Sequence, residues 1–160
     1  MYNLIGMKVF LLTILLSIFS LWIIPSVKAA EFLQGDNVTV TQDHIVEGSL
    51  FTAGESIRID GTVHGDVYCA GKEIVITGIV EGDILCGGQT IILEGTLSGD
   101  IRVAGQIVDI IGKVGGNATT LGQTMTLQEQ SSVSGEIVSA AQDMRIRGHI
   151  SKDLNGWAEQ

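Results

Sequence analysis

Three consecutive stretches of the chain, VHGDVYCAGKEIVITG (residues 63–78), VEGDILCGGQTIILEG (80–95) and LSGDIRVAGQIVDIIG (97–112), are versions of one another. Their glycines and aliphatic residues recur every 17 residues, as in the series Gly61, Gly78, Gly95 and Gly112. Similarity at a fixed period is typical of stacked-repeat proteins, in which each unit buries its apolar side chains against its neighbours. The sequence therefore predicts a stacked-repeat architecture.

The apolar positions within each repeat lie two residues apart, which is the alternation of a β-strand with one face inside. Two of these columns are Ile57, Ile74, Ile91, Val108, Met125, Met144 and Ile59, Ile76, Leu93, Ile110, Leu127, Ile146. A helix is disfavoured because each of the frequent glycines would cost it about 1 kcal/mol. The predicted fold class is all-β.

Three glycine-marked corners in each repeat indicate a β-solenoid, a coil of short strands that stacks on the next coil at about 4.8 Å. Glycine suits such corners because it accepts positive φ angles and allows close passage of the backbone. We expect about six coils within residues 44–160. The interval from Gly116 to Gly135 is 19 residues, which predicts a two-residue bulge within residues 128–132.

The first 29 residues are predicted to be a secretory signal peptide. Lys8 precedes an apolar run of 16 residues, Val9 to Ile24, and a small-residue cleavage site ends at Ala29. The alternative is an uncleaved anchor formed by residues 9–24, which is shorter than the roughly 20 residues of most membrane spans. Either interpretation places the repeats outside the cytoplasm, at the cell envelope or secreted, with residues 30–43 as an N-terminal segment before the repeats.

The composition limits the partners. The net charge is −9, and acidic proteins are poor ligands for nucleic acid or anionic lipid headgroups. We expect no nucleic-acid partner, and contact with a membrane only through residues 9–24 if they are not cleaved.

The repeat pattern resembles that of the bactofilins, a family of polymer-forming cytoskeletal proteins. The resemblance rests on Gly82-Asp83-Ile84, Gly87-Gly88, Ile91, Leu93, Gly95 and Leu97, and it extends over about residues 44–157. It implies a right-handed β-helix of triangular cross-section that polymerises end to end, without nucleotide, into non-polar filaments that serve as scaffolds for cell shape. Many bactofilins are cytoplasmic, and the export leader is a departure from them.

An enzyme of the left-handed β-helix acyltransferase class is the structural alternative. Those enzymes resemble one another in a six-residue repeat and a catalytic histidine, whereas the period here is 17 and His44, His64 and His149 occupy different positions in the repeat. No motif places a nucleophile beside a base. We therefore expect a non-enzymatic protein without a cofactor.

Carboxylates recur after the corner glycine and would line one edge of the solenoid. The position is filled by Ser49, Asp66, Asp83, Asp100, Asn117, Glu136 and Asp153. One interpretation is a calcium ladder at Asp66, Asp83, Asp100, Glu136 and Asp153, because Ca²⁺ prefers oxygen ligands. The favoured interpretation is that each side chain accepts a hydrogen bond from a turn N–H, a role that Ser and Asn also fill.

Cys69 and Cys86 occupy the same repeat position, in a column that should face inward. Their Cα atoms should be close enough for a disulfide, and an exported protein can be oxidised. Stacked Cβ atoms about 4.8 Å apart exceed the preferred separation, so buried free thiols are the favoured prediction.

Two regions are candidate contact surfaces. Val75, Ile92, Ile107 and Ile111 should face outward, which indicates either an exposed apolar patch or a face covered by residues 32–43. Solenoid ends expose unpaired backbone that recruits other chains. Trp157 and Leu154 near one end, with Val46 and Phe51 near the other, are predicted self-assembly residues, and Trp157 is either a plug for the core or an end-to-end anchor.

The sequence thus favours a homopolymeric scaffold. The alternative is a monomeric extracytoplasmic binding module whose partner is a cell-envelope protein, a wall polymer or calcium.

Overall fold

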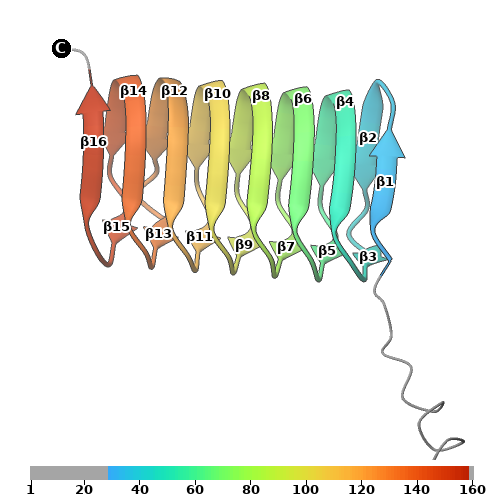
Figure 1. The fold of residues 1–160 in the computed structure, drawn as a ribbon. Coiled ribbons are helices and arrows are strands. Elements are labelled where there is room, and N and C mark those ends of the chain that lie inside the picture. Colours follow the sequence, from blue (N-terminus) through green and yellow to red (C-terminus); the bar gives the residue numbers. More distant parts are fainter. Residues whose placement is uncertain (1–28, 159–160) are drawn as a thin grey trace, which may run out of the picture.

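The computed structural model describes residues 29–158, and these residues form a β-solenoid of parallel strands without a helix (Figure 1). Seven turns are complete and an eighth begins. The all-β solenoid with a 17-residue period is therefore confirmed. The predicted signal peptide, or anchor, lies outside the described residues except for Ala29.

Each of the six turns that begin with β4, β6, β8, β10, β12 and β14 contains one long and one short strand. The long strands are β4 (Leu50–Ile59), β6 (Val67–Ile76), β8 (Ile84–Leu93), β10 (Ile101–Ile110), β12 (Ala118–Leu127) and β14 (Ile137–Ile146). The short strands are β3 (Ile45–Val46), β5 (Thr62–Val63), β7 (Ile79–Val80), β9 (Thr96–Leu97), β11 (Lys113–Val114), β13 (Ser132–Val133) and β15 (His149–Ile150). At the ends lie β1 (Glu31–Gln34), β2 (Asn37–Val40) and β16 (Leu154–Ala158).

The long strands bend in the middle. Ladder pairing passes from Gly71↔Gly88 to Glu73↔Thr90 and omits Lys72 and Gln89, which lie at the bend. The two halves of each long strand and the short strand therefore form three sides, in agreement with the triangular cross-section that the resemblance implied. We name the outer surfaces of the first halves, the second halves and the short strands the first, second and third face.

The coil is right-handed. In Figure 1 the first halves run upward in front, the chain crosses the top, and the second halves run downward behind, while successive turns advance from right to left.

The core consists of the inward columns that the alternation predicted. Ile57, Ile74 and Ile91 stack in register, as do Ile59, Ile76 and Leu93, and all six are fully buried. Every strand is hydrogen-bonded to an equivalent strand of a neighbouring turn. The stacking of turns therefore both buries the apolar side chains and pairs the backbone groups.

The corner glycines serve close stacking. No glycine among the described residues has a positive φ angle. A Cβ atom at Gly95 would instead collide with the carbonyl oxygen of Gly78, and one at Gly78 with that of Gly61. Of the two expected reasons for glycine, only the close passage of the backbone applies.

The N-terminal segment forms an additional first turn. Strands β1 and β2 pair with the first and second halves of β4, through Phe32↔Phe51 and Val38↔Ile57. Residues 32–43 therefore extend the rod, which rules out the alternative interpretation that they cover an outer face. The third side of this turn is β3.

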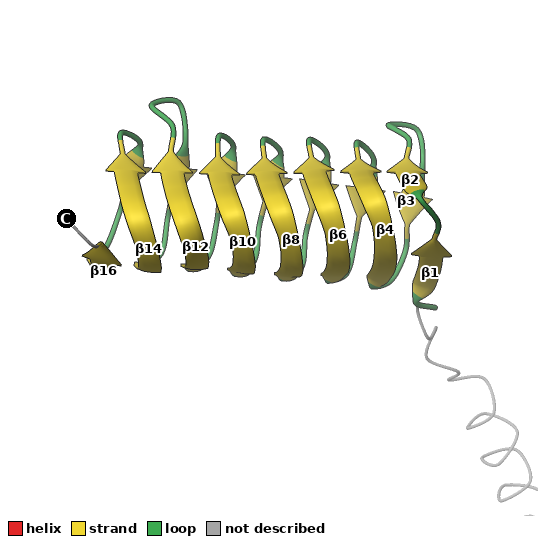
Figure 2. Cartoon of the chain, turned by 90° about the horizontal axis from the view of Figure 1, so that it is seen from above, coloured by secondary structure: helices red, strands yellow, loops and turns green. Residues whose placement is uncertain are grey.

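Two turns of the solenoid contain extra residues at the same corner. Residues 41–44 follow β2 and residues 128–131 follow β12, where larger loops are visible in Figure 2. Each loop is closed by a backbone hydrogen bond, from the His44 N–H to the Thr41 carbonyl and from the Ser131 N–H to the Gln128 carbonyl. The two extra residues predicted within 128–132 are therefore present as a turn between strands.

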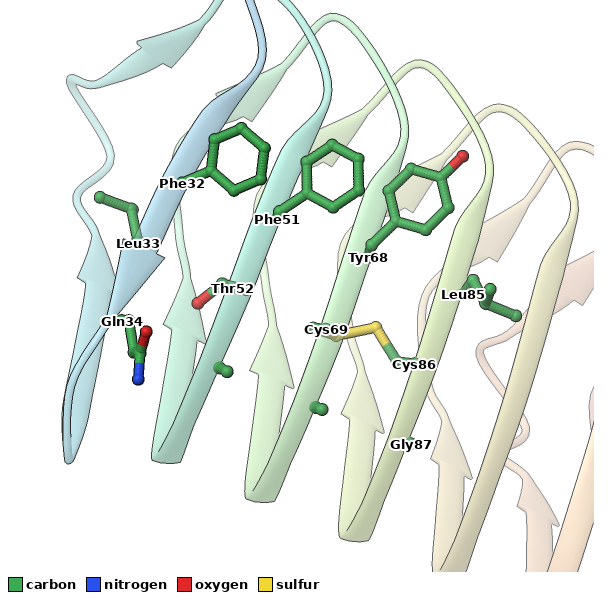
Figure 3. Close-up of a pocket in the computed structure, with 12 residues that line it drawn as sticks. Phe32, Leu33, Gln34, Phe51, Thr52, Tyr68, Cys69, Leu85, Cys86 and Gly87 are labelled. Atoms are coloured by element: carbon green, nitrogen blue, oxygen red, sulfur yellow. A yellow bond between two sulfur atoms is a disulfide. The ribbon is translucent and has the colours of Figure 1, made fainter.

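Cys69 and Cys86 form a disulfide, and the prediction of free thiols is wrong (Figure 3). Their Cα atoms are 4.6 Å apart, within the range that a disulfide spans. The two residues are paired in the parallel ladder. Parallel Cβ directions do not prevent the bond, because the two sulfur atoms meet along the rod axis. The bond joins β6 to β8 below the first face.

Candidate interaction surfaces

The first face is built from two outward columns, one of large and one of small side chains. The first, the ridge column, begins with Phe32, Phe51, Tyr68 and Leu85 and continues with Arg102, Thr119, Val138 and Asn155. The second, the groove column, begins with Gln34, Ala53, Ala70 and Gly87 and continues with Ala104, Leu121, Ala140 and Trp157. Arg102 is the single charged residue in these two columns.

Aromatic rings stack along the start of the ridge column. The ring centroids of Phe32 and Phe51 are 4.9 Å apart, and those of Phe51 and Tyr68 are 4.6 Å apart, with interplanar angles of 12° and 9°. Both ring faces of Phe51, and one ring face each of Phe32 and Tyr68, are thus used within the stack. Such a ladder offers few free ring faces to a sugar, so it favours a packed apolar surface over a wall-polymer platform.

A shallow groove of about 630 Å³ runs beside the stacked rings. Ala53, Ala70 and Gly87 line it, and the disulfide lies beneath (Figure 3). A Cβ atom at Gly87 would meet nothing within 4 Å, so the groove is open there. Ridge and groove lie side by side over the first four turns.

Large apolar side chains are exposed along the whole first face. Phe32 is 74% exposed, Leu85 52% and Trp157 75%, and Leu121 and Val138 are also exposed. A monomeric soluble protein rarely exposes a contiguous apolar surface of this extent without a partner. The first face is therefore the principal candidate interaction surface.

The predicted apolar patch lies on the second face and is interrupted. Val75 and Ile92 are paired but half-buried, Ile107 is exposed, and Ile111 is half-buried beyond the end of β10. Asp109 follows Ile92 in the same column, so a carboxylate stands between the aliphatic positions. The structure does not bring these four residues together as one patch.

The predicted self-assembly residues occupy different environments. Leu154 faces the core and is 43% exposed, because no strand covers β16 within the described part of the chain. Trp157 pairs with Ala140 and is exposed on the first face, so its interpretation as a core plug is wrong. Val46 is buried, and Phe51 stacks between Phe32 and Tyr68. Val46 belongs to β3 in the first turn and so lies at the N-terminal end of the third side, whereas Phe51 lies one turn further in, behind Phe32.

The carboxylate edge is a hydrogen-bonded ladder. The Asp83 N–H donates to Oδ1 of Asp66 (2.9 Å), the Asp100 N–H to Oδ1 of Asp83 (2.9 Å), and the Asn117 N–H to Oδ1 of Asp100 (2.8 Å). Asn117 accepts from the Glu136 N–H in the same way, and Ser49 from that of Asp66. These bonds confirm that the side chains accept turn N–H groups, which belong to the following coil.

Charge on this edge is partly neutralised by Arg102, which donates to Oδ2 of Asp83 (3.1 Å) and of Asp100 (2.9 Å). The hydrogen bond from the Asp100 N–H, followed by that from Arg102, lowers the pKa of Asp83. The calcium ladder gains no support, because the described residues contain no group of three His, Cys, Asp or Glu side chains placed to hold a metal ion. Glu136 and Asp153 occupy the equivalent position in the next two turns.

The three histidines lie apart. His44 contacts Glu31 at 3.2 Å in the first turn, His64 contacts Glu81 at 2.8 Å between neighbouring turns, and His149 is exposed on β15. At the bend of the long strands, Gln89 Nε2 donates a hydrogen bond to Oε1 of Gln106 in the next turn at 3.2 Å.

Comparison with known proteins gives no relative: no family model, no curated protein and no solved structure matches the chain. Among residues 29–158, no helix has the length and apolar character to cross a membrane.

The first face was missed because each outward position looks ordinary within one repeat. Single Phe, Tyr, Leu or Ala residues at the surface are common. The face can be recognised only by comparing equivalent positions of successive repeats. Phe51, Tyr68 and Leu85 are 17 residues apart, as are Ala53, Ala70 and Gly87.

Proposed function

We propose that this protein is a non-enzymatic, bactofilin-like scaffold of the cell envelope that is exported and assembles end to end into oligomers or filaments. The β-solenoid fold is compatible with a structural scaffold, since stacked parallel turns form a continuous rod whose length is set by the number of turns.

The observation that carries the proposal is the uncovered apolar core at β16, the last strand of the described residues. Leu154 faces the core with 43% of its surface exposed, and Met144, Ile146 and Ile150 behind it are only partly buried. Within the described residues, β16 pairs only with β14, so its second edge has free backbone groups. A free edge beside an open apolar core recruits another strand.

The N-terminal end differs from the C-terminal end. Val38 and Val40, on the second half of the first turn, are buried although no turn precedes them within residues 29–158. The C-terminal end is therefore the expected site of contact between rods.

Sedimentation of the purified protein at several concentrations, with electron microscopy of the same samples, tests the proposal. The wild-type protein should grow into longer particles of constant width as the concentration rises. Leu154→Asp should prevent this growth. Ile107→Asp is the matched control, because Ile107 is also 43% exposed but lies on the second face, and it should assemble like the wild type.

Equal assembly of Leu154→Asp and the wild type would refute the end contact. A wild-type monomer at every concentration would favour the alternative, a monomeric extracytoplasmic binding module.

Export has its own test. Expression of the full chain in a bacterial host, followed by fractionation and intact mass measurement, should recover an extracytoplasmic protein that begins at Ala30. Recovery of an intact chain in the membrane fraction would favour the uncleaved anchor at residues 9–24, and recovery of the intact chain in the cytoplasm would contradict export.

A further inference from the structure

We infer that the first face binds a second copy of the chain with the two rods parallel, related by a two-fold axis that runs along the rods between the ridge column and the groove column. This side contact goes beyond the proposed end contact and does not depend on it. It rests on the sizes of the side chains within each turn, on the charges at the two borders of the face, and on its area.

Each turn after the first presents one large and one small side chain on this face. Where the ridge position is large, the groove position of the same strand is small, and where the ridge position is small, the groove position is large. The first kind of pair is Phe51 with Ala53, Tyr68 with Ala70, Leu85 with Gly87, Arg102 with Ala104 and Val138 with Ala140. The second kind is Thr119 with Leu121 and Asn155 with Trp157. Only the first turn, with Phe32 and Gln34, departs from this rule among the described residues.

A two-fold axis parallel to the rods makes use of this size matching. Two copies that meet face to face about such an axis keep the same direction, and each turn lies over the same turn of the partner with ridge and groove exchanged. Leu85 therefore lies over Gly87 of the second copy, and Leu121 lies over Thr119. Two-fold contacts require a self-complementary surface, and paired sheets of parallel, in-register strands pack by interdigitation of this kind.

The two borders of the first face carry complementary groups. The carboxylate edge lies beside the ridge column, and the exposed residues of the bend lie beside the groove column. In the parallel pair each carboxylate faces the bend residue of the same turn in the partner. The facing pairs are Asp66 with Lys72, Asp83 with Gln89, Asp100 with Gln106 and Glu136 with Gln142. Every bend residue in these pairs has N–H groups to donate to a carboxylate.

The same two borders exclude an antiparallel pair through this face. An antiparallel two-fold axis would lay ridge over ridge and the carboxylate edge over the carboxylate edge. Facing groups of like charge oppose association, and two facing ridges would hold the sheets apart. Both size and charge therefore select the parallel orientation.

Arg102, the one charged residue of the two columns, needs no partner in the second copy. It lies over Ala104, and its guanidinium is paired with Asp83 and Asp100 in its own chain. These ion pairs hold the charge at the carboxylate edge, on the border of the face. The contact therefore leaves no unpaired charge at this position, which would otherwise oppose burial.

The area is sufficient for a pair of rods. Eight stacked strand segments of about five residues cover about 600 Å² on each copy, or about 1,200 Å² in total. This is the lower limit for specific interfaces, so the dimer should be concentration-dependent.

The test uses the Leu154→Asp background, which removes the end contact, so that the two contacts can fail separately. Seven of the eight strand segments on the first face lie outside β16, so the side contact does not depend on this change. Sedimentation at several concentrations should detect a reversible dimer with the length of one rod.

Gly87→Leu tests the fit of ridge and groove. The space beyond the Gly87 Cα atom is empty, so this variant should fold like its parent, yet its new side chain collides with Leu85 of the second copy. The collision occurs on both sides of the two-fold axis, and the dimer affinity should fall by about 100-fold or more. Thr90→Leu is the matched control, because Thr90 lies on the second face of the same strand, and it should leave the affinity unchanged.

A compensating substitution distinguishes a packing contact from a folding defect. The variant with both Leu85→Ala and Gly87→Leu exchanges the large and the small side chain of that turn, so each leucine again faces a small residue of the partner. Its affinity should recover to within about tenfold of the parent, because volume-conserving exchanges are tolerated best.

Val138→Cys reports the orientation of the rods. In the parallel pair, the two copies of this residue lie in the same turn, across packed sheets about 10 Å apart. In an antiparallel pair they would lie five turns apart, roughly 24 Å along the rod. A short bis-maleimide should therefore join Val138→Cys chains into covalent dimers and should not join Arg145→Cys chains, whose cysteine lies on the second face of the same strand. The native cysteines are bonded to each other and do not react.

Four outcomes would overturn the inference. They are a monomer at all concentrations in the Leu154→Asp background, a dimer that Gly87→Leu leaves intact, an exchange variant that binds no better than Gly87→Leu alone, and equal cross-linking of Val138→Cys and Arg145→Cys. A monomer that binds phosphatidylcholine vesicles through the first face would replace the second copy with a lipid surface.

Discussion

The two halves of each long strand have the same backbone structure but different side chains on their inner and outer surfaces. In the second half, the inward columns are aliphatic and fully buried, as with Ile74 and Ile91, while the outward columns include Glu73, Asp109 and Arg145. In the first half, the outward columns carry almost no charge, and one inward column contains small or polar residues such as Thr52 and Ser139. The second half presents charged groups to solvent, whereas the first half presents an exposed apolar face.

This contrast predicts that the second half contributes most to stability. Ile91→Ala should lower the free energy of unfolding by roughly 2–5 kcal/mol, because a fully buried side chain is replaced by a cavity. Val103→Ala, in the first-half inward column, should cost less because fewer buried carbons are lost. Urea unfolding followed by circular dichroism measures both, and a larger loss for Val103→Ala would reverse the comparison.

The disulfide compensates for the less aliphatic interior of the first half. Replacing both cysteines by valine, the residue that continues their column at position 103, should cost about 3 kcal/mol, since a loop of 17 residues is no longer closed in the unfolded chain. A reductant should lower the melting temperature of the wild type and leave that of the Cys69→Val, Cys86→Val variant unchanged. The prediction fails if the reductant affects both proteins equally.

The bend between the halves should tolerate a methyl group at one glycine and not at its neighbour. A Cβ atom at Gly88 would lie 2.6 Å from the carbonyl oxygen of Gly71, whereas one at Gly87 would contact nothing. Gly88→Ala should therefore cost about 1–3 kcal/mol, and Gly87→Ala should stay within about 0.5 kcal/mol of the wild type. Thermal unfolding of the two variants decides this, and similar losses would show that the turns can separate to make room.

Acid should weaken two corners of the solenoid, the one before the first half of a long strand, where Asp83 lies, and the one after the second half, where Asp60 lies. The pKa of Asp83 is lowered by the Asp100 N–H and by Arg102, and that of Asp60 by the Thr77 hydroxyl and then by Arg58. A lowered pKa in the folded state stabilises the protein above the unfolded value of about 3.9, and this stability is lost as the pH falls through the folded value.

Unfolding free energies measured from pH 7 to pH 2 should therefore decline below about pH 4. Asp83→Asn should reduce the slope in that range and cost less than about 1 kcal/mol at pH 7, because an amide oxygen accepts the same N–H, as Asn117 does from Glu136. An unchanged slope would remove Asp83 from the acid response.

The smallest effect is expected at Thr52. Its hydroxyl is buried in the first-half interior and has no hydrogen-bond partner among residues 29–158, whereas Thr120 donates to Ser139 at 2.8 Å. Thr52→Val should leave stability unchanged or raise it by up to about 1 kcal/mol. Thr120→Val is the informative contrast in the same denaturation assay, since it should destabilise, and a clear loss for Thr52→Val would indicate that its hydroxyl has a partner.

The period of 17 was enough to predict the solenoid, its inward columns and the hydrogen-bonding role of the carboxylate edge. The first turn was not predicted, because Glu31 pairs with Leu50 at a spacing of 19 and breaks that period. The extra residues at positions 41–44 cause this shift, as residues 128–131 do between β12 and β14.

Other features depend on interatomic distances and strand pairings that the repeat pattern does not contain. The disulfide depends on a Cα separation of 4.6 Å and on side-chain rotation. The orientation of Trp157 depends on the pairing of β16 with β14, which assigns it to the first face rather than to the core. The sequence could predict which residues share a column, but not how much of each column remains exposed.

The two longer turns indicate where this rod can acquire new sequence. Both extra segments leave the solenoid at the same corner, between the second-half strand and the short strand, and the strands on either side keep their pairing partners. Insertions at this corner can therefore lengthen the chain without lengthening the rod. Loops, tags or whole domains grafted there would be displayed in a row along one edge of the molecule, leaving the first face free.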